Sequence, residues 1–205
     1  MIEFELKYKV KSKERFAKYD ATKSVIQRDI YYDTNDGLLY RAGNFLRKRN
    51  DARIDFKLYA GDDSHLFCSE TNFNYQTFSS CDESLTGICR KIGLSGKCFG
   101  SFDEFLSAYS LRVLAPVVKR RYQFQWEEIL VSIDEVADLG TFLEAELSYP
   151  DVDFDKEAAK SRLENRLIEA GLIVKGLDEI VTIGYVECYL KRFNPNMYLQ
   201  GKYKD

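Results

Sequence analysis

Acidic and basic residues alternate at the start of the chain, where Glu3, Glu5 and Lys7 are each separated by one apolar residue. In a β-strand these side chains point to one face, because successive side chains alternate sides. Carboxylates are ligands for hard divalent cations, and an ammonium group contacts phosphate oxygens. A sheet with one solvated face explains a single strand equally well, so the rest of the chain decides between these interpretations.

The same alternation recurs in later segments. The charged residues that would share strand faces are Arg47 with Arg49, Arg53 with Asp55 and Lys57, Lys119 with Arg121, and Glu144 with Glu146, while Glu70 and Asp134 are single acids. Acids dominate the first and last of these strands and bases the middle ones. A solvated sheet gains more from interleaved opposite charges. The pattern therefore favours strands whose charged faces enclose a ligand.

These strands predict an α+β fold. Closing about eight of them gives a closed or nearly closed antiparallel eight-stranded β-barrel tunnel with a charged interior, flanked by helices. Crowded charges in a confined space need partners. Arginine and lysine suit a polyphosphate, and clustered carboxylates suit Mg²⁺ or Mn²⁺. We expect a small-molecule polyphosphate with a divalent metal as the ligand.

The chain resembles the CYTH superfamily, or triphosphate tunnel metalloenzymes, over about residues 1–190. The motifs that carry the resemblance are Glu3-x-Glu5-x-Lys7, Tyr31-Tyr32-Asp33-Thr34 with Leu38 and Leu39, Phe45-Leu46-Arg47-Lys48-Arg49, Lys57, Glu70, Lys119-Arg120-Arg121, Ser132-Ile133-Asp134-Glu135-Val136 and the run from Leu139 to Glu146. The family includes inorganic and thiamine triphosphatases, class IV adenylyl cyclases and, more distantly, RNA triphosphatases. Taken in order, the motifs are specific.

The resemblance implies a role for each matched residue. The implied metal ligands are Glu3, Glu5, Glu144 and Glu146, with Asp134 and Glu70 supporting the metal or orienting water. The implied triphosphate contacts are Lys7, Arg47, Arg49, Lys57, Lys119 and Arg121. Catalysis by a hydrolase would rest on Glu3, Glu5, Lys7, Glu70 and Asp134, and water would attack the terminal phosphorus in line.

Three functions remain open on these residues. A metal-dependent triphosphatase is the leading hypothesis. A class IV adenylyl cyclase would bind ATP and attack the α-phosphorus with the ribose 3′-hydroxyl, but the sequence carries no clear adenine-binding signature. A non-catalytic polyphosphate or nucleotide binder would gain nothing from the two Glu-x-Glu pairs beside phosphate.

Turn and capping signals place the elements between these strands. Strands are predicted at 27–33, 44–49, 52–59, 65–74, 117–127, 128–135 and 141–148, in addition to the first. Helices are predicted from Ser12, from the capping box at Ser80, from Ser101, over 153–170, and from Asp178 to Phe193. We expect one domain over 1–193 and a polar tail over 194–205.

Several charged residues have plainer interpretations. Arg53 and Asp55 fit a salt-bridged pair, and Arg120 fits an outward position. Asp29 shares a face with Tyr31 and could reach the tunnel, but a hydrogen bond that supports a turn is the preferred interpretation. The single histidine, His65, follows a probable loop and fits a surface role better than that of a general base.

Composition bounds the remaining properties. The 205 residues carry a net charge of −3, which gives no overall attraction to nucleic acid or an anionic membrane. The five cysteines form no C-x-x-C pair, so reduced thiols are expected. No long apolar stretch or signal region precedes the first strand, so we expect a cytoplasmic protein with no membrane partner, either monomer or homodimer.

Overall fold

The computed structural model describes residues 2–19, 23–59, 68–94, 96–149 and 155–205, except for the side chains of residues 2, 3, 23, 68, 148, 149 and 156. The strands are β1 (Ile2–Val10), β2 (Lys23–Asp33), β3 (Phe45–Arg49), β4 (Arg53–Tyr59), β5 (Cys68–Asn74), β6 (Arg112–Trp126), β7 (Ile129–Val136), β8 (Gly140–Tyr149) and β9 (Glu179–Ile180). The helices are α1 (Leu38–Arg41), α2 (Glu83–Lys91), α3 (Phe102–Ala108), α4 (Lys156–Glu169), α5 (Tyr185–Phe193) and α6 (Pro195–Tyr198), with 3-10 turns at Glu14–Phe16 and Tyr75–Thr77.

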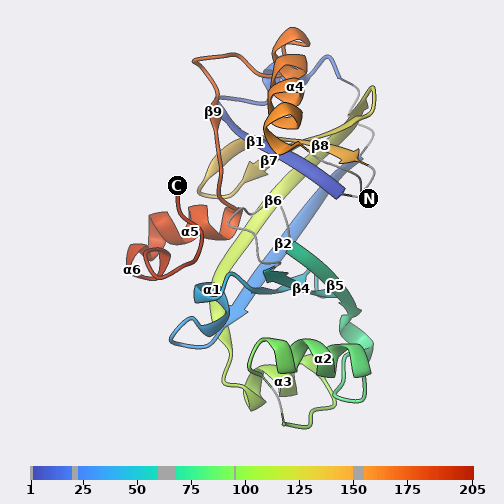
Figure 1. The fold of residues 1–205 in the computed structure, drawn as a ribbon, viewed down its shortest axis with the longest axis vertical. Coiled ribbons are helices and arrows are strands. Elements are labelled where there is room, and N and C mark those ends of the chain that lie inside the picture. The colour runs from blue at the N-terminus through green and yellow to red at the C-terminus, as the bar shows by residue number, and fades with distance from the viewer. Residues whose placement is uncertain (1, 20–22, 60–67, 95, 150–154) are drawn as a thin grey trace. The chain divides into compact units, whose positions relative to one another are not determined.

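The fold is α+β, with helices beside an antiparallel sheet (Figure 1). Nine strands form this sheet in the order β5-β4-β3-β2-β6-β7-β8-β1-β9. The expected closed barrel of eight strands is not confirmed, because among the described residues β5 and β9 end the sheet and are not hydrogen-bonded to each other. The chain divides into two units: unit 1 is Met1–Gln27, Val118–Thr182 and Asp205, and unit 2 is Arg28–Val117 and Ile183–Lys204.

In unit 1, β1 pairs with β8 along its whole length. The predicted alternation is confirmed, since Phe4, Leu6 and Tyr8 are buried. Helix α4 lies across β1 (Figure 1) and buries Leu163 and Leu167. The apolar faces of α4 and β1 exclude water where they meet. Their burial fixes the register of β1, and with it the face that carries the charged side chains.

Helix α4 begins after Asp155, whose side chain accepts a hydrogen bond from the Ala158 amide, and the chain leaves it through Gly171 at φ 68°. The predicted helix over 153–170 is thus confirmed over its described part. The predicted helix start at Asp178 is wrong. The Asp178 carboxylate instead accepts from Arg15 and from the Val174 amide, and α5 begins only at Tyr185.

In unit 2, β3 and β4 form the predicted hairpin around Asn50 and Asp51, which both have φ of 52°. Small polar residues tolerate this left-handed conformation better than others, which explains their place in the turn. The outer face of the hairpin carries Leu46, Ile54 and Phe56, and these pack into one core with residues of α2 and α3. Figure 1 shows these two helices side by side.

The aromatic residues of unit 2 concentrate in this core. Phe78 lies 5.2 Å from Phe102 and 5.3 Å from Phe105, both edge to face. Ser101 caps α3 as predicted. The cap of α2 is Asp82 and not Ser80, because the Ser80 hydroxyl accepts from the Phe99 amide across the loop.

Residues of the predicted tail pack on unit 2. Gly201 lies against the Tyr40 ring so closely that a Cβ atom would be 2.4 Å from it. The buried Tyr203 ring stacks on Phe45 at 6.3 Å and meets Tyr59 at 6.5 Å. Within the described residues, no helix is long and apolar enough to cross a membrane.

Candidate active site

The charged face of unit 1 is assembled by strand register. Glu5 lies directly opposite Glu146, and Lys7 lies opposite Glu144, in the β1–β8 ladder. The β6–β7 ladder places Arg121 opposite Asp134. Side chains opposite one another in a ladder have Cβ atoms about 4.5–5.5 Å apart, so register alone brings acids and bases from distant parts of the sequence together.

Two cations of this face share one carboxylate. The Lys119 ammonium donates to Asp134 Oδ2 at 2.6 Å, and the Arg121 guanidinium donates to both oxygens of Asp134 at 2.7 and 2.6 Å. Arg121 also donates to Glu144, whose other oxygen lies 3.3 Å from Lys7 Nζ. Asp134 is therefore an anchor for the two basic residues of β6.

Burial separates these residues into two groups. Lys119 and Asp134 are 4% and 0% exposed. Burial lowers the pKa of Lys119, an effect that Glu144 and Asp134 only partly offset. The Glu5 side chain is instead 41% exposed, so it is open to a ligand.

The carboxylates of this face fit a divalent cation. Mg²⁺ is usually bound through one or two carboxylates together with substrate phosphates, and it keeps several waters. Glu5 and Glu146 supply two facing carboxylates, and two like charges at opposite ladder positions favour a cation between them. No group of three or more histidine, cysteine, aspartate or glutamate residues arranged around a metal position occurs in the described part of the chain. The Glu3 side chain lies outside the described residues.

The charged face of unit 2 is a grid across four strands. One row of opposed residues is Asp29, Arg49, Arg53 and Asn74. The next row is Tyr31, Arg47, Asp55 and Asn72, and beyond it Lys57 opposes Glu70. Residues predicted from sequence to share faces therefore do share one within this unit.

Each base of this grid meets a carboxylate. Arg47 donates to Asp55 Oδ2 from Nε at 2.8 Å and from Nη2 at 2.6 Å. Arg49 donates to both oxygens of Asp29, at 2.7 and 2.6 Å. Such charge-assisted, two-pronged bonds are stronger than neutral ones and fix the guanidinium planes.

The pairs at the rim of the grid are more exposed. Lys57 Nζ lies 2.9 Å from Glu70 Oε2, and each side chain is 30% exposed. Arg53 Nε lies 2.7 Å from Asp55 Oδ1, which confirms the predicted pair.

The carboxylates also set the protonation of the grid. Burial alone would lower the pKa of Arg47, but Tyr31, Asp29, Asp55 and Glu70 outweigh burial and raise it. Burial would raise the pKa of Glu70, but Lys57 above all lowers it. Both groups are therefore held in the charged form.

Sequence reasoning missed that Asp29 holds Arg49 and that Asp55 holds Arg47 in addition to its predicted partner Arg53. The Asp29 carboxylate lies on the charged face, which is the alternative that the sequence left open. Alternation along β2 and β4 carried the signal, because each aspartate is two residues from a residue on the charged face. Arg120 is exposed, as predicted, while His65 lies outside the described residues.

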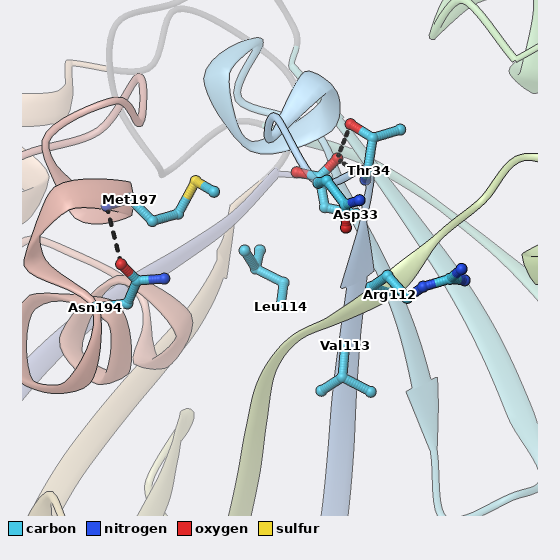
Figure 2. Close-up of a pocket in the computed structure, with 8 residues that line it drawn as sticks. Asp33, Thr34, Arg112, Val113, Leu114, Asn194 and Met197 are labelled. Atoms are coloured by element: carbon cyan, nitrogen blue, oxygen red, sulfur yellow. Dashed lines mark hydrogen bonds between the residues drawn. The ribbon is translucent and has the colours of Figure 1, made fainter.

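A separate pocket opens in unit 2, beside the end of β2. Figure 2 shows it, and its lining consists of Asp33, Thr34, Asn35, Arg112, Val113, Leu114, Asn194 and Met197. Asp33 has a structural role in this pocket, because its carboxylate accepts hydrogen bonds from the amides of Leu39 and Tyr40 and so stabilises the start of α1. None of the site residues predicted from sequence lines this pocket.

A model of the CYTH domain matches residues 1–172. The chain belongs to the CYTH family. Every residue named on the two charged faces lies within the matched range, so both faces are parts of the CYTH domain. The predicted family resemblance is confirmed.

Individual proteins are similar to the chain over nearly its full length. A protein of Methanocaldococcus jannaschii named "Putative adenylate cyclase" is 27% identical over 193 residues, which cover 91% of this chain and 98% of that protein. A solved structure from Pyrococcus horikoshii has a TM-score of 0.63 at 22% identity and covers 93% of this chain and 99% of its own. A structure from Hippeastrum, a "Putative adenylyl cyclase" described as revealing a dominant triphosphatase activity, has a TM-score of 0.57 at 17% identity and covers 93% and 96% of the two chains. The structural likenesses show a shared fold.

Proposed function

We propose that the protein is a divalent-metal-dependent hydrolase of inorganic triphosphate or of an organic triphosphate. The observation that carries the proposal is the register that sets Glu5 opposite Glu146 with Lys7 and Arg121 on the same face. A plain anion-binding surface would not gain from two facing carboxylates, because they repel phosphate. The description of the Hippeastrum structure supports the same reaction class.

Glu5 and Glu146 are proposed to hold Mg²⁺ or Mn²⁺, with Glu3 and Glu144 beside them in the same strands. When bound, such an ion neutralises phosphate charge and polarises the phosphorus–oxygen bonds. We assign Asp134 to positioning, since it is buried between Lys119 and Arg121.

The bases are proposed to differ in their roles. Lys7, Arg49, Lys57 and Arg121 would contact phosphate oxygens, because each is at least partly exposed. Arg47 and Lys119 are buried against carboxylates and would act mainly by fixing the groups beside them. Fixed positive charges stabilise the charge that moves toward the leaving oxygen without having to reorganise.

The attacking group in this proposal is water. The partly exposed carboxylate of Glu70, held by Lys57, would orient it for in-line attack on the terminal phosphorus. No covalent enzyme intermediate is required.

A second candidate is an adenylyl cyclase that forms cyclic AMP from ATP. The name of the Methanocaldococcus jannaschii relative favours it. It would use the same metal and phosphate contacts but cleave at the α-phosphorus.

The test is to incubate the protein with Mg²⁺ or Mn²⁺ and, in turn, inorganic triphosphate, thiamine triphosphate and ATP, while measuring both phosphate and cyclic AMP. Phosphate release without cyclic AMP is the expected result. Cyclic AMP from ATP would favour the second candidate, and no product from any substrate would refute both.

A further inference from the structure

Arg53 is the most exposed base on the charged face of unit 2. Its side chain is 41% exposed, compared with 20% for Arg49 and 7% for Arg47. The family motifs that predicted the site do not include Arg53. Its pairing with Asp55 accounts for only part of the N–H donors of the Arg53 guanidinium.

The carboxylate that Arg53 contacts is already shared. Asp55 is fully buried and accepts from Arg47 Nε and Nη2, and its Oδ1 atom lies 2.6 Å from the amide of Asn72. Arg53 donates to Asp55 Oδ2 from Nη2 at 3.3 Å, its Nε lies 2.7 Å from Oδ1 without making a hydrogen bond, and it lies 3.8 Å from Glu70. Asp55 therefore makes shorter hydrogen bonds to Arg47 than to Arg53.

The charges of this grid do not cancel. Its described members are the bases Arg47, Arg49, Arg53 and Lys57 and the carboxylates of Asp29, Asp55 and Glu70, which leaves one positive charge in excess. The excess falls at the rim, where the side chains are open to solvent.

Register adds a second reason for an anion at this position. Arg49 and Arg53 lie directly opposite each other in the β3–β4 ladder, next to the hairpin turn. Like charges at opposed positions destabilise a ladder, so an anion beside both guanidinium groups would add to the compensation that Asp29 and Asp55 supply. Asp29 fixes the guanidinium plane of Arg49 on one side, so only the Arg53 side of the pair is left to adapt to a ligand.

From this arrangement we propose that Arg53 and Arg49 together form a seat for one phosphate group of the substrate, with Arg53 as a further substrate-binding residue. The inference rests on the proposed function in that the anion is taken to be a triphosphate. The exposed guanidinium of Arg53, beside the positive charge of Arg49, whose Nε and Nη2 are held by Asp29, suits a tetrahedral phosphate with several equivalent oxygens. The pair then contributes to affinity and to the orientation of the polyphosphate chain, and not to the chemical step.

The test is calorimetric titration of the protein with tripolyphosphate in the presence of EDTA, so that binding is measured without metal and without turnover. Removing a charge-assisted contact weakens binding by about 10- to 100-fold, and that loss is expected for Arg53→Ala. Arg53→Lys keeps the charge without the fork, so intermediate binding is expected. Far-UV circular dichroism and thermal unfolding check that the variants remain folded.

Arg28→Ala is the matched control. Arg28 is exposed on β2 beside the same turn, where its amide donates to Asn50 Oδ1, but it lies on the opposite face from Asp29. The Arg28→Ala variant removes the same charge as Arg53→Ala. Its affinity for tripolyphosphate is expected to stay within about twofold of that of the unchanged protein. The proposed phosphate position at Arg49 and Arg53 would be refuted if Arg53→Ala bound tripolyphosphate as tightly as the unchanged protein. It would also be refuted if Arg28→Ala lost as much affinity as Arg53→Ala, or if the unchanged protein did not bind tripolyphosphate. Binding that depends on Arg53 in a protein that releases no phosphate would instead refute the proposed function and leave the seat intact.

Discussion

Asp55→Asn tests whether the buried carboxylates hold the bases of unit 2 in place. Asp55 is 0% exposed and accepts both prongs of Arg47, which is itself 5% exposed. The amide variant leaves a buried guanidinium without its main counter-charge. Breaking a buried ion pair in this way costs about 3–5 kcal/mol.

The magnitude for Asp55→Asn should fall at the lower end of that range. Arg47 still has Asp29 and Glu70, each at 3.5 Å. We therefore expect a loss of about 3 kcal/mol in the free energy of unfolding. For a chain of this length this lowers the melting temperature by about 6–12 °C.

Urea unfolding monitored by far-UV circular dichroism measures the loss, and Asp51→Asn is its control. Asp51 accepts from Lys48 at the same short distance, 2.7 Å, but its side chain is 74% exposed. An exposed pair contributes at most about 1 kcal/mol, so the control should be nearly neutral.

The double variant Arg47→Met/Asp55→Asn separates pairing from other effects. Removing both charges avoids the orphaned guanidinium, so the double loss should be at least about 2 kcal/mol smaller than the sum of the single losses. Additivity within about 0.5 kcal/mol would refute the claim that Asp55 acts through Arg47.

Three further predictions follow from burial and charge. The pKa of Glu70 is lowered, so the folded protein binds the Glu70 proton less tightly than the unfolded chain does. The stability that the Glu70 carboxylate contributes is complete above its ordinary pKa of 4.5 and is lost as the pH falls below that value, through the lowered pKa. Glu70→Gln should therefore lose less stability than the unchanged protein between about pH 5 and pH 3 in parallel urea titrations, and equal losses would contradict this. Tyr203→Ala should cost about 3 kcal/mol by thermal unfolding, because it removes a buried ring from Phe45, whereas Leu199→Ala, at 63% exposure, should change stability by less than about 0.5 kcal/mol. Burial raises the pKa of Cys89 to about 11, so mass mapping after iodoacetamide treatment should show the exposed Cys81 and Cys98 modified at least about 100-fold faster, and equal rates would show that Cys89 is accessible.

Strand faces could be predicted from sequence because burial has a period of two along a strand. Phe4 and Leu6 are buried while Glu5 and Lys7 share the other face, as alternation requires. The hairpin at Asn50 could be predicted because the turn conformation restricts the residue types that fit.

Positions set by long-range contacts could not be predicted in this way. Asp178 follows a plausible capping pattern, but its carboxylate is engaged by Arg15, which is distant in sequence. The strand predicted at 117–127 instead begins at Arg112 and includes Pro116, whose side chain is exposed. Local sequence signals indicate the backbone conformation that a residue prefers. They do not reveal which side chain, distant in sequence, forms an interaction with it.

The same limit applies to the candidate site. The sequence identified its bases and acids, but not that Glu5 would oppose Glu146 or that Arg49 would oppose Arg53. Register between strands decides these pairings, and it depends on the packing of whole faces. The pairing of Asp29 with Arg49 and of Asp55 with Arg47 followed only from that register.

The most direct test of the central claim is phosphate release from inorganic triphosphate as Mg²⁺ or Mn²⁺ is titrated, compared between the unchanged protein, Glu5→Gln and Glu135→Gln. Glu135 pairs with Lys13 outside the proposed site, so its variant is the matched control. The account predicts metal-dependent release that the control retains and Glu5→Gln loses by about 100-fold or more, since each carboxylate removed weakens both the metal and its position. Full activity in Glu5→Gln, or release that does not depend on the metal, would contradict it.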